Sequence, residues 1–122
     1  VTEATMVNPT HLVAVGGIIG AVLRYYVSQA VEAELFPLGT LIVNVVGSFV
    51  LGWVTFLGLG NDALLFIGTG ACGSFTTFSS FSVGVVQLWE EDEHLVSAGY
   101  AAANLLGALV AIGIAWVVAQ GF

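Results

Sequence analysis

A run of small, hydroxyl-bearing and aromatic residues between positions 68 and 82 carries the groups of this sequence best suited to contact a solute. It holds three Gly, three Phe and, after Thr69, six further Ser or Thr residues, within an otherwise apolar stretch. Hydroxyls donate hydrogen bonds, and the edge of an aromatic ring carries the positive part of its quadrupole. Phe78 and Phe81 are three residues apart and would project from one helical face. These donors favour a small anion as the solute.

Other apolar segments contain isolated polar residues at helical spacing. Asn44 and Ser48 are four residues apart, as are Tyr100 and Asn104. Such groups are costly in lipid unless they face protein, water or one another. No carboxylate stands in the middle of an apolar segment, which argues against a proton relay or a carboxylate ring for a cation. Arg24 is the one charged residue inside such a segment, and we expect a structural role for it, by snorkelling or by hydrogen bonds to carbonyls.

The composition identifies the class of protein that must position these groups. The chain has 122 residues, of which 58% are hydrophobic and 7% are charged, with eight acids, one Arg and no Lys. A soluble domain carries about 25% charged residues. The composition excludes an ordinary soluble globule, a disordered chain and a nucleic-acid binder with a basic patch. The chain is therefore expected to be an integral membrane protein with no nucleic-acid partner.

Four long apolar segments account for nearly the whole chain, at about 11–31, 38–59, 63–89 and 95–119. About 20 helical residues cross a hydrocarbon core of about 30 Å, and the segments lack the alternation of barrel strands. We expect an all-α, multi-pass membrane protein with a single four-helix domain over 1–122. Asn8-Pro9-Thr10 is a helix start signal before the first span. The acids stand almost entirely between spans, at Glu32, Glu34, Asp62 and Glu90-Glu91-Asp92-Glu93.

The third and fourth segments differ in their small residues. Gly, Ser and Thr in the third favour departure from a regular helix, which membranes tolerate only where the backbone is buried in protein or lines a cavity. We expect a broken helix there, and the alternative is a kinked helix packed by small residues. The fourth segment has a small residue at every fourth position, a pattern typical of close helix packing, at Gly99, Ala103, Gly107, Ala111 and Ala115.

The charge pattern leaves the membrane orientation open. Lys and Arg near the spans normally determine orientation, and Arg24 alone could contribute. The chain therefore either inserts in both orientations or relies on a partner. The missing Lys and the acidic loops also indicate an organism with high internal salt, as a hypothesis that the Lys content of neighbouring proteins would test.

Three motifs in chain order resemble those of the Fluc/CrcB family of fluoride channels, and the resemblance covers nearly the whole chain from Gly16 onward. They are GGIIGAVLRY at 16–25, GTLIVNVVGSF at 39–49 and GSFTTFSSF at 73–81. The resemblance implies an antiparallel, dual-topology dimer with two pores that export fluoride passively across the plasma membrane, without enzymatic activity. The partner subunit would be a second copy or a homologous subunit.

The resemblance also implies roles for particular residues. The family's pore asparagine falls on Asn44 and its pore phenylalanines on Phe78 and Phe81. Main-chain carbonyls at positions matching Gly73 and Thr76 would hold a structural Na⁺ at the dimer centre. The hydroxyl track beside the pore would include Ser79, Ser80, Tyr100 and Asn104. Two positions depart from the family pattern: Ser80 replaces a common Thr, and Ala108 stands where Ser is common, so the far end of the track would lack that hydroxyl.

Two other classes of protein fit parts of the sequence. A small multidrug-resistance-type transporter shares four short spans and antiparallel pairing, but its proton coupling needs a membrane-embedded Glu, and none of the eight acids lies mid-span. A structural membrane subunit without transport activity is the third class. The hydroxyl run argues against it, because lipid disfavours these groups unless they are buried for a purpose.

Overall fold

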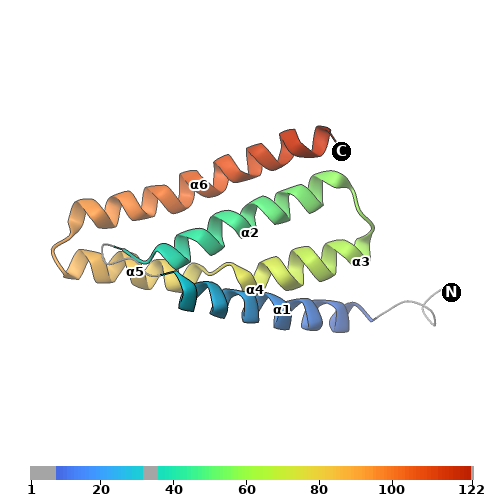
Figure 1. The fold of residues 1–122 in the computed structure, drawn as a ribbon, viewed down its shortest axis with the longest axis horizontal. Coiled ribbons are helices and arrows are strands. Elements are labelled where there is room, and N and C mark those ends of the chain that lie inside the picture. Colours follow the sequence, from blue (N-terminus) through green and yellow to red (C-terminus); the bar gives the residue numbers. More distant parts are fainter. Residues whose placement is uncertain (1–7, 32–35, 122) are drawn as a thin grey trace.

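The computed structural model describes residues 8–31 and 36–121 and is helical throughout its regular elements. Glu32 and Glu34, two of the acids expected between spans, lie outside the described residues. The elements in chain order are α1 (Pro9–Ala30), α2 (Leu38–Leu57), α3 (Asn61–Ala63), η2 (Leu64–Cys72), α4 (Gly73–Phe75), α5 (Phe78–Glu90) and α6 (His94–Gln120) (Figure 1).

Within the described residues, four helical stretches are long and apolar enough to cross a membrane: Pro9–Ala30, Leu38–Leu57, Asn61–Glu90 and His94–Gln120. The expected all-α architecture of four spans is therefore confirmed. Successive spans run in opposite directions, so the start of α1 and the end of α6 lie at the same end of the bundle (Figure 1). The predicted helix start is also present, because Asn8 Oδ1 accepts the Thr10 N–H at 2.8 Å and Pro9 is the first helical residue.

Small residues bring α6 against α2 (Figure 1). Ala115 is completely buried, and a Cβ at Gly52 would lie 3.3 Å from its methyl group. A Cβ at Gly107 would lie 2.9 Å from a methyl of Val45. Gly99 differs, because no atom of the described chain lies within 4 Å of the position a Cβ would take. The predicted packing stripe is confirmed in the second half of α6, and Gly99 is not part of it.

Glycines also bring α1 into backbone contact with η2. A Cβ at Gly16 would collide with the Phe66 carbonyl, and one at Gly20 would collide with the Ala71 carbonyl. Ser74 Oγ of α4 donates to the Gly17 carbonyl at 2.6 Å, so α1 is also bonded to the element that follows η2. The η2 stretch is a nine-residue π-helix, a winding that is rare and usually short.

The third span is broken between α4 and α5, as predicted, and is not merely kinked. Thr76 has φ −82° and ψ 162°, and Thr77 has φ −151° and ψ 119°, so both residues are extended. The helix restarts at Phe78, where Thr77 serves as N-cap and its Oγ1 accepts the Ser80 N–H at 3.1 Å. The third span covers Asn61–Glu90. The break therefore places extended backbone in the interior of a span that is otherwise helical.

Candidate functional site

The side chain of Asn44 lies against the break and bonds to both polar backbone groups of Thr77. Its Oδ1 accepts the Thr77 N–H at 2.8 Å, and its Nδ2 donates to the Thr77 carbonyl at 3.1 Å. Nδ2 also donates to Asn104 Oδ1 at 2.9 Å. Asn104 Nδ2 in turn donates to the Tyr100 carbonyl at 3.0 Å. Two amides thus connect α2, the break and α6.

An open groove of about 800 Å³, here called the main groove, runs along one side of the break. It brings together six residues predicted for the pore or the cation site, namely Asn44, Gly73, Thr76, Phe78, Phe81 and Asn104. Ser48, Thr69 and Thr77 add hydroxyl groups, and Ala108 contributes a methyl group. The remaining lining residues are Gly47, Leu51, Gly68, Cys72, Ala101 and Leu105.

Three aromatic rings form a row beside the break. The centroids of Phe78 and Phe81 are 5.7 Å apart, and those of Phe81 and Tyr100 are 5.9 Å apart. The two phenylalanines therefore do share a face, as their spacing predicts. Phe78 is 78% exposed in the single chain, whereas Tyr100 is only 3% exposed. The row thus leads from an open surface into the protein interior.

The hydroxyl of Tyr100 is buried and has no hydrogen-bond partner among the described residues. The side chains of Thr40 and Asn104 lie close enough to interact with it, but neither makes a hydrogen bond of regular distance and angle. An unpaired buried donor costs about 1–3 kcal/mol, so such groups are rare and call for a physical explanation. An acceptor that visits this position would supply one.

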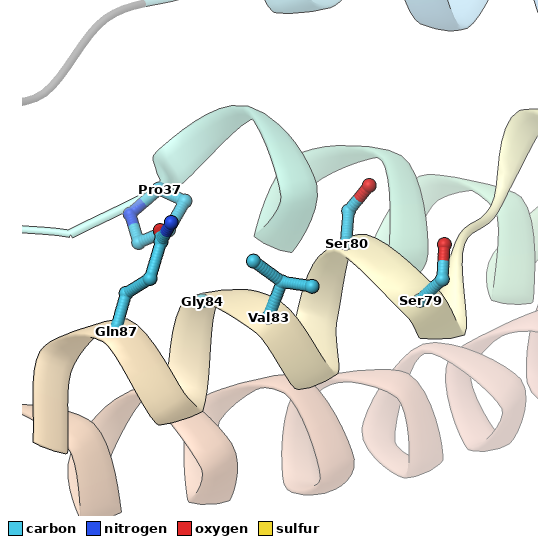
Figure 2. Close-up of a pocket in the computed structure, with 6 residues that line it drawn as sticks. All are labelled: Pro37, Ser79, Ser80, Val83, Gly84 and Gln87. Carbon is cyan, nitrogen blue, oxygen red and sulfur yellow. The ribbon is translucent and has the colours of Figure 1, made fainter. Parts of the chain in front are cut away.

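Two smaller cavities lie around the start of α5. The first, of about 280 Å³ and here called the Arg24 cavity, is lined by Ala21, Arg24, Tyr25, Ser28, Thr40, Val43, Thr77 and Ser80. The second, of about 260 Å³, is lined by Pro37, Ser79, Ser80, Val83, Gly84 and Gln87 (Figure 2). Figure 2 shows the hydroxyls of Ser79 and Ser80 projecting from α5 on the side away from α6. Ser80 lines both cavities, so the two spaces adjoin at this residue.

The predicted pore residues are therefore divided between two places. Asn44, Phe78, Phe81 and Asn104 line the main groove, whereas Ser79 and Ser80 line the smaller cavities. Tyr100 lies behind Phe81, which its ring contacts. Arg24, expected to be structural, is half-buried and lines a cavity beside several hydroxyls, where its guanidinium can also attract an anion.

Thr77 is a lining residue that reasoning from the sequence did not single out. It is 8% exposed and, among the described residues, is the one that lines both the main groove and the Arg24 cavity. The Thr77-Phe78-Ser79-Ser80 stretch does carry a signal, since a Thr three residues before Ser80 is a typical N-cap for a helix that restarts after a break. Thr40 was missed too, because most of the other residues that line the Arg24 cavity come from other helices.

A cation at the break would have to use neutral oxygens, among which the main-chain carbonyls are the candidates. Within residues 8–31 and 36–121, no group of three or more His, Cys, Asp or Glu could hold a metal ion. In an uninterrupted helix the Thr77 N–H would donate to the Gly73 carbonyl, but here it donates to Asn44. The Gly73 carbonyl therefore loses its helical donor, and both Gly73 and Thr76 line the main groove.

Comparison with known proteins assigns the chain to a family. Residues 11–116 match the family model described as CrcB-like protein, Camphor Resistance (CrcB). The fluoride-specific ion channel FluC 2 of Haloarcula marismortui is 57% identical over 106 residues, which cover 87% of this chain and 89% of that protein. FluC 1 of Halobacterium salinarum is 54% identical over 109 residues, covering 89% and 92%. FluC of Thermotoga maritima is 43% identical over 118 residues, again covering 89% and 92%. The chain therefore belongs to the CrcB family of membrane ion channels and is a multi-pass membrane protein, not an enzyme.

Proposed function

We propose that this protein is a fluoride-selective channel that lets fluoride leave the cell passively across the plasma membrane. The relatives are named as fluoride-specific ion channels, and the carrying observation in this chain is the Tyr100 hydroxyl. This donor is buried and unpaired among the described residues, and it lies beside the row formed by Phe78 and Phe81. A small acceptor that passes the aromatic row would satisfy it.

The chemistry of the lining suits a small, strongly hydrated anion. A channel must replace lost hydration yet bind weakly enough for the ion to leave. In this proposal, Arg24 attracts the anion into its cavity, and Ser79 and Ser80 supply neutral donors near the start of α5. The ring edges of Phe78 and Phe81 then line a narrow route, with Tyr100 and the Asn44–Asn104 pair beside it.

The proposed channel is an antiparallel dimer with two pores, formed with a second copy or with a homologous subunit. The open main groove supports this, since lipid chains cannot hydrogen-bond to polar groups such as the hydroxyls of Ser48 and Thr69 that line it. Phe78, at 78% exposed, would gain a covering surface from the second subunit. The near absence of basic residues leaves both insertion orientations open.

A structural Na⁺ at the dimer centre is part of the proposal. The Gly73 carbonyl, without its helical donor, and the carbonyl of Thr76 at the end of α4 would hold it, together with the same atoms of the second subunit. Oxygen ligands suit a hard cation, and the break supplies carbonyls that a regular helix does not. When bound, the ion would add positive potential near the anion route and would join the subunits.

A small multidrug-resistance-type transporter is not favoured. Proton coupling would need a carboxylate at membrane depth. The acidic side chains within the described residues are Asp62 in α3, Glu90 at the end of α5 and those of the turn at 91–93. All of them lie at the ends of spans, where they face the aqueous sides.

Fluoride efflux from proteoliposomes containing the purified chain tests the proposal. We expect fluoride efflux to exceed chloride efflux by orders of magnitude. Phe78→Ile removes the ring edge at an exposed position and should reduce fluoride efflux strongly. Phe56→Ile, at a phenylalanine of α2 that is 42% exposed, is the matched control and should not. Equal efflux of both anions, or equal effects of the two substitutions, would contradict the proposal.

A further inference from the structure

We propose that Thr77 is a residue of the anion route, forming the wall between the main groove and the Arg24 cavity, and that Asn44 is a positioning residue that holds this wall. The inference rests on the proposed function. In this inference Asn44 acts on Thr77, whereas in a direct role the Asn44 amide would itself donate a hydrogen bond to the ion.

The hydrogen bonds of Asn44 leave its amide no free hydrogen for an ion. The orientation of the amide is determined, since the Thr77 N–H is a donor and requires Oδ1 as its acceptor at 2.8 Å. The two hydrogens of Nδ2 then go to the Thr77 carbonyl at 3.1 Å and to Asn104 Oδ1 at 2.9 Å. An ion could bind Asn44 only by displacing one of these bonds.

The same bonds explain why the break is stable. Extended residues inside a membrane span leave backbone groups unpaired, which is expensive where water is absent. Asn44 satisfies both the N–H and the carbonyl of Thr77, as a neighbouring strand would. Asn104, whose own Nδ2 is bonded to the Tyr100 carbonyl, holds Asn44 from the other side. Thr77 is thereby locked to both α2 and α6.

The position of Thr77 makes it the boundary between the two spaces. It lines both the main groove and the Arg24 cavity and is only 8% exposed. Asn44 and Asn104 line the main groove, and Arg24 and Ser80 line the cavity on the other side. An anion that moves from Arg24 to the aromatic row must pass Thr77.

The hydroxyl of Thr77 has a hydrogen to offer to that anion. Its oxygen accepts the Ser80 N–H at 3.1 Å, so the hydroxyl hydrogen points elsewhere. Ser79 Oγ lies 3.5 Å away, a long and weak partner that an anion can replace. Thr77 can therefore pass the ion from one cavity to the other through a neutral donor.

The hydroxyl of Thr77 is tested by fluoride efflux from three variants. Thr77→Val keeps the shape and the backbone bonds to Asn44 but removes the hydroxyl, both as a donor to the ion and as the acceptor of the Ser80 N–H, and we expect fluoride efflux to fall about tenfold. Thr77→Ser should restore most of the efflux. Thr55→Val on α2, whose hydroxyl bonds to the Leu51 carbonyl at 2.7 Å, is the matched control and should conduct normally. Wild-type efflux in Thr77→Val, or no recovery in Thr77→Ser, would overturn the role of Thr77.

The positioning role of Asn44 is tested by comparing Asn44→Asp with Asn104→Asp. Both substitutions add the same charge to neighbouring positions. Asp at 44 loses both donor bonds, whereas Asp at 104 keeps its acceptor for Asn44. We expect faster amide hydrogen exchange at residues 73–81 and efflux at least tenfold lower in Asn44→Asp than in Asn104→Asp. Equal exchange and equal efflux would overturn the role of Asn44. Hydrogen exchange reports on the bond to Thr77 even if the wild type fails to conduct fluoride, so failures of the two proposals are distinguishable.

Discussion

Replacing Tyr100 with Phe should stabilise the protein and impair transport at the same time. The substitution keeps the ring and its contacts with Phe81 and Phe36, whose centroids lie 5.9 and 5.7 Å away. It removes only the hydroxyl, which is buried and unpaired among the described residues. Most deletions of a buried polar group remove a bond and destabilise. This one removes a donor that lacks an acceptor.

The magnitude follows from the cost of an unpaired buried donor, about 1–3 kcal/mol. In fluoride-free buffer, Tyr100→Phe should raise the free energy of unfolding by about 1 kcal/mol or more, because that cost disappears. During permeation, the wild-type hydroxyl donates to the ion and the variant cannot. If that bond stabilises the ion at the highest free-energy barrier of the route by about 1.4 kcal/mol, its loss lowers the rate of fluoride permeation about tenfold.

The assay combines unfolding and flux on the same preparation. Unfolding of the detergent-solubilised protein is followed in chloride and again with added fluoride, and fluoride efflux is measured from proteoliposomes. Tyr26→Phe is the matched control, since Tyr26 is 63% exposed and should change neither quantity. A destabilised Tyr100→Phe variant with undiminished fluoride efflux would refute the reasoning, because the hydroxyl would then serve the fold and not the ion.

Three further predictions concern packing and charge. Gly20→Ala should destabilise the protein by about 1–3 kcal/mol in an unfolding experiment, since the added Cβ would collide with the backbone of η2. Gly113→Ala is the control and should be neutral or stabilising, because no neighbouring described atom lies within 4 Å of the added methyl group. Ser97→Ala should lower the unfolding free energy by about 1 kcal/mol, because its buried hydroxyl donates to the Val85 carbonyl at 2.8 Å. Changing the acids of 90–93 to their amides should raise fluoride efflux several-fold at low salt and leave it unchanged near 1 M, where the Debye length is about 3 Å. These acids begin three residues after Gln87, which lines the same cavity as Ser79 and Ser80.

The fold was largely predictable from the sequence, because hydropathy along the chain reports directly on membrane spans. The four spans and the helix start at Asn8 needed only local information. The break was predictable in kind, since Gly, Ser and Thr at membrane depth are compatible with an interrupted helix. The π-helix at Leu64–Cys72 was not, because its winding is selected by the contacts of η2 with Gly16 and Gly20 of α1.

The site was predictable as a set of residue types but not as an arrangement. Asn44 bonds to Thr77 and Asn104, which are 33 and 60 residues away in sequence, and no local pattern reveals such partners. The spacing of Phe78 and Phe81 gave their shared face correctly. Ser80 is on the same helix but lines the Arg24 cavity, because one face of α5 borders the main groove and another borders the Arg24 cavity. Arg24 was expected to be structural, and its contribution to that cavity depends on the break, which brings Thr77 to the opposite wall.

The central claim is that neutral donors at the break in the third span conduct fluoride selectively. The most direct test is the ratio of fluoride to chloride efflux from proteoliposomes that contain only this chain, with empty liposomes as background. We predict rapid fluoride efflux and chloride efflux close to the background. Chloride efflux comparable to that of fluoride, or no fluoride efflux from a correctly inserted and assembled protein, would contradict the claim.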